Sequence, residues 1–181
     1  FGAAAWMDDD YDCNVIEDIA HAMGAVDQQG RLAGTRGIAG AVSFYPSKLL
    51  GAVGDGGAII TSERGIYDRA RQLRHYGVEA EGVTLRGQNS RLCEIQAAIL
   101  RVKLPHVHGW IARRRAIAAR YKAELPNLPP VQNDPGSVHH VYVVRHPERD
   151  AFRSRLAAAG IPTMVHYPKA IHQHPRWRHL G

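Results

Sequence analysis

Residues 43–57 read SFYPSKLLGAVGDGG, a short apolar run that leads into a lysine and then a glycine-rich turn. The run at 41–45 has the composition of a buried strand. Lys48 follows this run, and glycines stand at positions 51, 54, 56 and 57. Such glycines let a backbone pass close to a bound ring or phosphate, and a reactive lysine must be held and desolvated. Pattern alone still favours a surface lysine, because most lysines are exposed.

A second informative segment lies upstream, where residues 15–25 read VIEDIAHAMGA. Residues 14–17 are predicted as a buried strand that delivers Asp18 at its carboxyl end. In open α/β sheets that end is where ligands bind, so Asp18 is a candidate site residue. The alternative is a helix cap, since Asp18 precedes an alanine-rich stretch and aspartate is a preferred cap. For Asp18 alone, the cap is the simpler explanation.

The first half alternates short apolar runs with glycine-rich turns. A further strand is predicted at 57–61, and a helix at 64–76 that Gly77 can close. This alternation of strands and helices is typical of an α/β domain.

Helical periodicity continues in the middle of the chain. A helix is predicted over 93–104, with three apolar residues, Ile95, Ile99 and Val102, on one face. Pro105 interrupts that helix, and a second helix is expected from about 108 to 125.

A linker rich in proline and asparagine spans 126–136. After it the pattern restarts with a strand, a helix closed by Gly160 and a strand, predicted at 140–145, 150–159 and 163–167. We therefore predict two domains, a partial large domain over 1–125 and part of a smaller C-terminal domain over 126–181.

Composition restricts the class of protein. Of 181 residues, 45% are apolar and 22% charged, as in an ordinary soluble globular chain. Cys13 and Cys93 are too few for a disulfide framework and match no metal motif, so we expect reduced thiols, no metal site and a cytoplasmic location. The sequence contains no signal peptide and no apolar run near the ~18 residues of a membrane span. We expect neither membrane nor nucleic-acid partners, because the net charge of +6 is scattered and accompanies no nucleic-acid motif.

Taken together and in order, these segments resemble the DegT/DnrJ-type sugar aminotransferases. The strand–Asp–x–x–His element and the S-F-Y-P-S-K-x-L-G run are two of the motifs. Residues 86–104 (RGQNSRLCEIQAAILRVKL) resemble the family's G-x-N-x-R-x-x-E-x-Q-A-A segment, and residues 165–175 (VHYPKAIHQHP) resemble its H-Y-P-x-P-L-H-x-Q-P segment. Four ordered motifs over nearly the whole chain outweigh the simpler explanation of each residue.

The resemblance implies an α/β fold of the aspartate-aminotransferase type, in which a three-layer large domain with a mainly parallel sheet and flanking helices precedes a smaller α+β domain. It also implies pyridoxal 5'-phosphate (PLP) as the cofactor. Lys48 would carry PLP as a Schiff base and move the proton, and Asp18 would pair with the pyridine nitrogen. His21 would lie against the ring, and Ser43 would bind the phosphate.

The remaining roles implied by the resemblance concern the substrate and a second subunit. Asn89 would reach the cofactor phosphate of the partner in a homodimer with shared active sites. His166, Tyr167 and His172 would border the substrate pocket, although a histidine-rich segment is as readily explained as polar surface. The reaction would move an amine from an amino acid, glutamate in this family, to a nucleotide-linked keto-sugar.

The sequence departs from the family's pattern in several places. It is shorter than usual members, which have a phosphate loop and a ring-stacking aromatic residue before Phe1-Gly2, so we expect an incomplete chain that is inactive alone. Twelve residues separate Gly2 from Val15, the minimum for a parallel crossover. Ala170 and His174 replace the family's proline and glutamine. We also expect uncovered apolar faces, and hence poor solubility or association.

Two other classes of function stay open. The chain could be a non-catalytic remnant that serves as a dimerising or regulatory subunit, an interpretation that rests on fold analogy. A module that binds an anionic ligand is supported only by the positive charge. Lys48 argues against the sugar dehydratases of the family, which have a histidine there, and two distant cysteines cannot hold an iron–sulfur cluster.

Overall fold

The structure, a computed structural model, describes residues 1–5, 12–131 and 134–180 of the chain. Its main sheet has three strands in the order β1 (Ile16–Asp18), β2 (Ala39–Ser43) and β3 (Gly57–Ile60). Strand β1 pairs with β2 in parallel, and β2 pairs with β3 antiparallel. The register places Asp18 opposite Ala41 and Ala41 opposite Ile59, so these three residues form a row across one face of the sheet.

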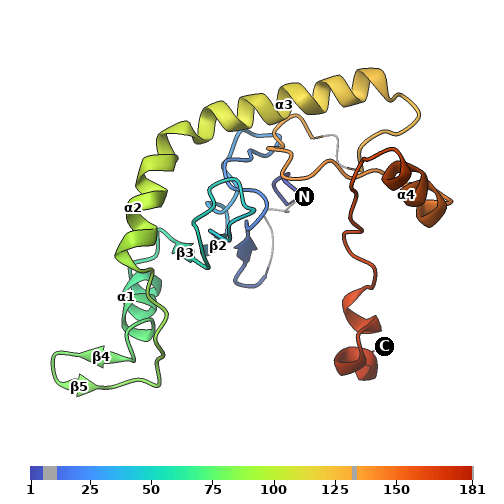
Figure 1. Cartoon of the computed structure of the whole chain (residues 1–181). Helices are drawn as coiled ribbons and strands as arrows, with labels where there is room; N and C mark the ends of the chain where they lie inside the picture. Colours follow the sequence, from blue (N-terminus) through green and yellow to red (C-terminus); the bar gives the residue numbers. More distant parts are fainter. Residues whose placement is uncertain (6–11, 132–133, 181) are drawn as a thin grey trace.

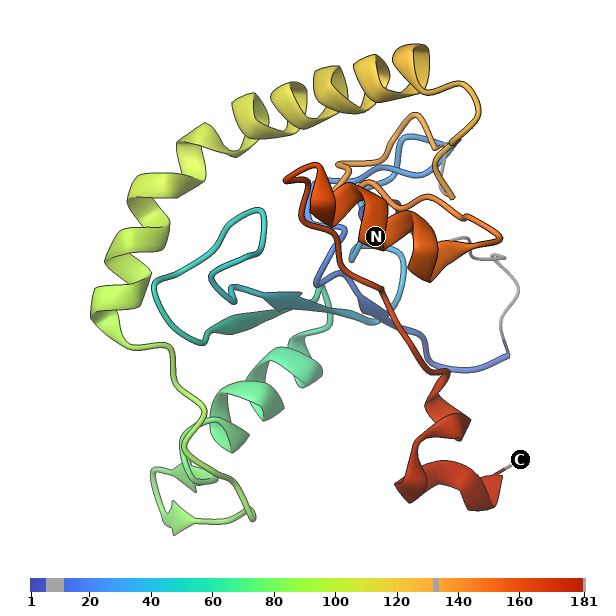
Figure 2. The ribbon, with the colours of Figure 1, turned by 45° about the vertical axis from the view of Figure 1, so that its right-hand side comes forward.

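Helices surround this sheet on several sides (Figures 1 and 2). The helices are α1 (Arg64–Leu73), α2 (Glu94–Lys103), α3 (Val107–Glu124) and α4 (Arg149–Ala158), with short 3₁₀ turns η1 (Leu104–His106), η2 (Ile171–Gln173) and η3 (Pro175–Leu180). A small hairpin of β4 (Val78–Glu79) and β5 (Gly82–Val83) follows α1. Helices α2 and α3 form one bent arch over the body of the molecule, and the bend falls at the η1 turn that contains Pro105.

Most of the predicted elements are confirmed, with ends that differ by a few residues. The strands expected at 14–17, 41–45 and 57–61 correspond to β1, β2 and β3. The helices expected at 64–76, 93–104, 108–125 and 150–159 correspond to α1, α2, α3 and α4. Gly77 and Gly160 follow α1 and α4 with φ of 74° and 76°, the left-handed conformation that closes a helix. The predicted α/β fold class is therefore confirmed.

Two predicted strands are wrong. Residues 140–145 form only an isolated bridge between Pro130 and Val144, beside a hydrogen bond from the Val131 N–H to the Val143 carbonyl. Residues 163–167 are irregular and pair with no strand among the described residues. A strand needs a neighbour that satisfies its backbone groups, and apolar or β-branched residues do not supply one. Part of the short segment expected between Gly2 and Val15 lies outside the described residues.

The core lies where the loops after β1 and β2 meet the inner side of the helical arch. Its buried apolar residues come from segments between residues 19 and 138: Ile19, Ala22, Ala25, Ala33, Leu49, Leu50, Ala52, Leu100, Val107, Ile111 and Val138. Helix α2 buries Leu100, whereas Ile95 and Val102, which share the predicted apolar face, are 71% and 72% exposed. Val138 follows the predicted domain boundary at residue 125 but packs in the same core as residues before it. The division into two domains therefore stays a prediction. Helix α3 ends next to that boundary, at Glu124.

A buried carboxylate fixes the first strand pair. Glu17 is only 5% exposed, and its oxygens accept hydrogen bonds from the backbone N–H groups of Gly34 (2.7 Å), Arg36 (2.7 Å) and Gly37 (2.9 Å). Gly34 has φ of 90°, and a Cβ on Gly40 would lie 2.9 Å from its Cα, so only glycines allow this loop to pack on β2. Burial alone would raise the pKa of Glu17, but the three N–H donors outweigh it and hold the pKa below its ordinary value of 4.5.

One face of the sheet is open. Ile16 and Ile59 lie on the same face as Asp18 and are 67% and 60% exposed. An exposed apolar sheet face next to an edge strand favours contact with another chain. No helix of the described part is both long and apolar enough to cross a bilayer.

Replacing Glu17 with alanine should destabilise the fold by about 2 kcal/mol or more, because three buried N–H donors lose their acceptor. In the wild type, the lowered pKa means that the stabilisation is present above pH 4.5 and is lost as the pH falls through the folded-state value. Urea unfolding at pH 7 and pH 3.5 measures both effects. Glu17→Gln should abolish this part of the acid dependence, and the control Glu81→Gln, at an exposed position, should not.

The isolated chain should associate through its open sheet face. Sedimentation velocity at rising concentration should show species larger than the monomer, and Ile59→Asp should reduce them by placing a charge on that face. Val83→Asp is a matched control, since Val83 is also exposed but lies on the small hairpin. A single monomeric species at all concentrations would contradict this expectation.

Candidate functional site

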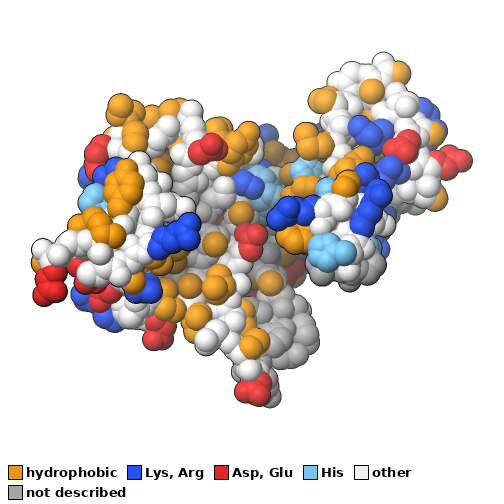
Figure 3. Space-filling model, turned by 90° about the horizontal axis from the view of Figure 1, so that it is seen from below, with side chains coloured by type: hydrophobic (Ala, Val, Ile, Leu, Met, Phe, Trp, Pro, Cys, Tyr) orange, Lys and Arg blue, Asp and Glu red, His pale blue; other side chains and the backbone are white. Residues whose placement is uncertain are grey.

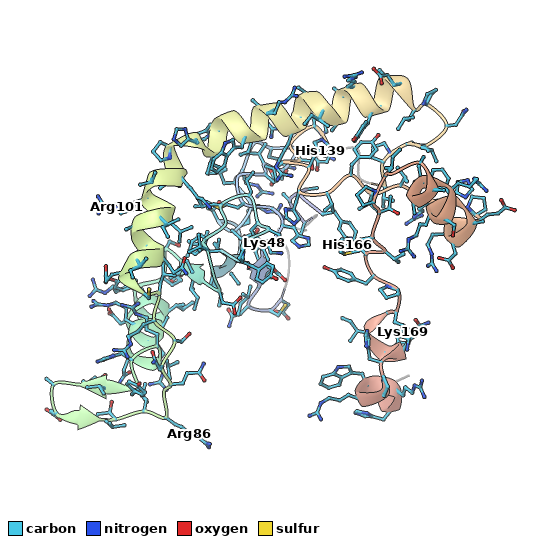
Figure 4. The ribbon with its side chains drawn as sticks, viewed as in Figure 1. Lys48, Arg86, Arg101, His139, His166 and Lys169 are labelled. Atoms are coloured by element: carbon cyan, nitrogen blue, oxygen red, sulfur yellow. The ribbon has the colours of Figure 1, made fainter. Side chains whose placement is uncertain are left out.

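Lys48 lies in a tight loop that the core holds in place. The Lys48 N–H donates to the Tyr45 carbonyl (2.8 Å), and the next two residues, Leu49 and Leu50, are buried in the core. The loop is closed by a hydrogen bond from the Ala52 N–H to the Phe44 carbonyl (2.8 Å). The side chain of Lys48 is therefore half-buried on a fixed backbone, at the centre of the molecule (Figure 4).

The predicted glycine-rich turn has a packing role in this loop. A Cβ on Gly51 would collide with the Pro46 carbonyl, and the Gly51 carbonyl accepts a hydrogen bond from Lys103 Nζ of α2 (2.5 Å). The glycine thus lets the chain fold back directly behind Lys48 and attaches it to the helical arch.

Asp18 stands at the carboxyl end of β1, as predicted. Its Oδ1 accepts a hydrogen bond from the Ala20 N–H (2.9 Å), which fixes the side chain. The residues after it form turns and no helix, so the helix-cap alternative is wrong. Within the described part of the chain, neither Asp18 nor Lys48 forms an ion pair, so both charges are available to a ligand.

His21 lies in the turn after β1. It interacts electrostatically with Lys48 and lies near a group of aromatic rings. Burial lowers the pKa of His21, and the Lys48 ammonium lowers it further, whereas Asp18 opposes the shift. The ring centroid of His21 lies 6.4 Å from that of Phe1 and 4.3 Å from that of His140. Lys48 therefore shares one electrostatic environment with Asp18 and His21, although Lys48 lies in the loop after β2 and the other two lie at the end of β1 and in the turn that follows it.

Two of the predicted substrate residues reach the same cluster from the C-terminal segment. The ring centroids of His166 and Tyr167 lie 6.2 Å and 6.4 Å from that of Phe1. In Figure 4 the side chains of His166 and Lys48 face one another across the space between the body and this segment. Seen from below, histidine and basic side chains line the recess between the body of the molecule and the C-terminal segment (Figure 3).

The other predicted residues lie outside this cluster. Asn89 is exposed beyond α1, where its Oδ1 accepts a hydrogen bond from Arg91 Nε (3.0 Å), and it lines an open recess of about 850 Å³. His172 is exposed in η2. Ser43 ends β2, and its Oγ accepts a hydrogen bond from the Tyr45 N–H (3.3 Å), so it stands beside the loop that carries Lys48.

One member of the cluster, His140, was not predicted from the sequence. Its ring packs on His21, burial and the charges of His21, Lys48 and Arg114 lower its pKa to about 4, and its buried Nδ1 has no hydrogen-bond partner among the described residues. The pattern HVYVVR indicated only a strand at this place. No residue type or spacing there reveals contact with a histidine more than a hundred positions away.

The chemistry of the cluster suits PLP. Lys48 offers an amine for a covalent link to the cofactor aldehyde, and Asp18 offers a carboxylate for a protonated ring nitrogen. The face of His21 offers a flat surface for the cofactor ring. The neighbouring ring of His140 has a buried Nδ1 atom without a hydrogen-bond partner among the described residues. The residues present therefore fit this group.

Comparison with known proteins identifies the family of the chain. The DegT/DnrJ/EryC1/StrS aminotransferase family matches residues 2–181. The erythromycin biosynthesis sensory transduction protein EryC1 of Saccharopolyspora erythraea is 42% identical over 173 residues, which cover 92% of this chain and 47% of that protein. The dTDP-3-amino-3,4,6-trideoxy-alpha-D-glucose transaminase of Micromonospora megalomicea subsp. nigra is 44% identical over 178 residues, covering 92% and 47%.

Solved structures give the same answer. DesV of S. venezuelae, crystallised with a ketimine intermediate, matches with a TM-score of 0.85 and 42% identity, over 92% of this chain and 46% of that chain. An aminotransferase from Brucella abortus matches with a TM-score of 0.83 and 34% identity. The chain spans about half the length of the curated relatives it matches. Since the family matches nearly every residue and the fold agrees, the chain belongs to the DegT/DnrJ/EryC1/StrS aminotransferase family.

Proposed function

We propose that the chain carries the PLP-binding part of an aminotransferase that moves an amine from glutamate to a nucleotide-linked keto-sugar. The observation that carries the proposal is the convergence of Lys48, Asp18 and His21 in one electrostatic environment, within a family of aminotransferases. A reactive amine from one segment, with a carboxylate and a flat imidazole from another, are the set of groups that PLP chemistry requires. The proposed location is the cytoplasm.

Each residue has a distinct proposed role. Lys48 would hold the cofactor covalently and would move the proton at the substrate carbon. Asp18 would keep the ring nitrogen protonated, and PLP when bound would supply the electron sink for the negative charge on that carbon. His21 would provide the surface for the ring, and the hydroxyl of Ser43 would bind the phosphate. Half-burial of Lys48 on a rigid loop keeps its amine in one place during both steps.

The proposed substrates follow from the names of the relatives. Three of them are named as transaminases of dTDP-linked amino sugars and two as aminotransferases of UDP-linked sugars. A nucleoside diphosphate is strongly anionic, which agrees with this chain's net charge of +6. We place His166 and Tyr167 at the border of the sugar pocket because they reach the cluster from the C-terminal segment. His172 would need to move from its exposed position to take part.

We further propose that two subunits share their sites. Asn89 lies outside its own subunit's Lys48 cluster, on an exposed segment held by Arg91, which suits a residue that serves a partner's cofactor phosphate. The open sheet face beside Asp18 leaves room for protein contacts that residues 1–5, 12–131 and 134–180 do not make.

The first test is reduction with borohydride after incubation with PLP, followed by digestion and mass spectrometry. We expect a pyridoxyl label on Lys48 and no label at that position in Lys48→Ala. Lys169→Ala is the matched control, because Lys169 is an exposed lysine of the C-terminal segment and its loss should leave labelling of Lys48 unchanged. Label that is absent, or spread evenly over surface lysines, would refute cofactor binding by this chain.

A second test concerns the carboxylate. Asp18→Asn should raise the PLP dissociation constant about ten- to a hundredfold, since hydrogen bonds to charged groups contribute roughly 1.5–3 kcal/mol. Titration by the absorbance of bound PLP measures this constant. Asp55→Asn, an equal change at an exposed aspartate in the glycine-rich loop, should have little effect. Equal affinities of Asp18→Asn and wild type would exclude the proposed pairing.

One alternative has specific support. Two relatives, at 42% and 41% identity, are named as a sensory transduction protein and a pleiotropic regulatory protein. A non-catalytic, dimerising or regulatory subunit would keep the fold and Asn89 without using Lys48. Absence of label on Lys48 in a chain that still dimerises would favour this function.

A further inference from the structure

The contact between His21 and His140 joins two distant parts of the chain at the candidate site. The ring centroids are 4.3 Å apart and the planes are inclined by 34°, a closer approach than that of either ring to the other aromatic groups of the cluster. His21 belongs to the loop after β1, and His140 lies beyond the proline-rich linker. Their contact is therefore a tertiary one that local structure does not impose.

The backbone around His140 is anchored from two sides. Arg114 of α3 donates from Nη1 to the carbonyls of His140 (3.0 Å) and His139 (3.3 Å). On the other side, the Val138 N–H donates to the Gly2 carbonyl (2.7 Å), and Val138 is completely buried. A short segment held in this way can fix a side chain as firmly as a regular strand does.

The turn at His139 directs the next side chain. His139 has φ of 46°, a left-handed conformation that is uncommon for a residue other than glycine. Its N–H donates to Ser137 Oγ (3.1 Å), which stabilises the turn. The chain therefore changes direction immediately before His140, which brings the imidazole of His140 onto that of His21.

We propose that His140 is a positioning residue of the candidate PLP site, whose ring packs on His21 and holds the His21 imidazole in its orientation beside Lys48. The inference rests on the proposed function, because it gives His21 the place against the cofactor ring. It assigns His140 no contact with substrate. Its action is on the orientation and the burial of its neighbour.

Electrostatics agrees with this arrangement. The charged or titratable groups that act on the two imidazoles from the surrounding segments are Lys48, His166, Arg114, Asp18 and the amino group of Phe1. Burial and the cations among these groups lower the pKa of both rings, that of His140 to about 4. Two uncharged rings can pack against each other at neutral pH without electrostatic repulsion between them or from the ammonium group of Lys48.

The test measures the titration of His21 by NMR in the cofactor-free, full 181-residue chain, with His21→Gln used to assign its resonance. In His140→Ala the His21 ring becomes more exposed to solvent, so the pKa of His21 should shift upward toward 6.5. His140→Phe keeps a ring at this place and should retain the wild-type titration. His146→Ala is the matched control, since His146 also packs on an aromatic ring, Phe152 at 4.5 Å, but outside the site.

A second variant keeps the test decisive if His140→Ala does not fold. Arg114→Gln leaves both imidazoles in the chain but releases the backbone of His140, and it should also shift the pKa of His21 upward. A wild-type titration of His21 in folded His140→Ala or Arg114→Gln would overturn the proposal. A purely structural role would lower stability without changing that titration, so the two roles are separable.

A cofactor titration separates this inference from the proposed function. The PLP dissociation constant should rise about two- to tenfold in His140→Ala and stay within about twofold of wild type in His140→Phe, as expected for the loss of one ring pair. If the wild type takes up no label at Lys48, the proposed function fails while the titration of His21 still decides the packing. If PLP binds normally to His140→Ala, the positioning role is refuted even though the function stands.

Discussion

The buried carboxylate of Glu17 is the interaction on which the arrangement of the site depends. It closes the loop at residues 34–37 onto β1, and this loop leads directly into β2. The parallel pairing of β1 with β2 then places Asp18 opposite Ala41 at the carboxyl end of the sheet. A charge is tolerated in this interior position because three N–H groups replace the water it loses. The same groups gain the acceptor that a loop without regular structure would otherwise lack.

The helical arch of α2 and α3 holds the remaining segments of the site in place. Lys103 of α2 holds the loop behind Lys48 through the Gly51 carbonyl. Arg114 and Arg115 of α3 donate hydrogen bonds to four backbone carbonyls, those of Gly136, Ser137, His139 and His140. Part of the chain's positive charge is thus structural, because these arginine side chains satisfy carbonyls of a segment that forms no regular strand. Loops that bind ligands are commonly held on rigid elements in this way.

The sequence predicted the elements whose signal is local. Strands β1, β2 and β3 and the four helices follow from apolar runs, helical periodicity and glycine punctuation, so their existence was predictable and only their ends differ. The motifs around Lys48 and Asp18 were found because their residues are close together in the chain. Residues 140–145 and 163–167 were wrongly predicted as strands, since composition describes a strand's preference and not the presence of a neighbour to pair with.

By itself, the sequence determined the α/β class and the family resemblance and indicated the candidate reactive groups, because each is encoded in short ordered motifs. Only the tertiary structure decided which of these groups meet. It brought His21, His140 and His166 to Lys48, left Asn89 and His172 outside, and placed Glu17, rather than its neighbour Asp18, in the interior. The physical reason is that contact between distant residues depends on packing and on the satisfaction of buried polar groups, which are properties of the whole fold and not of any local pattern.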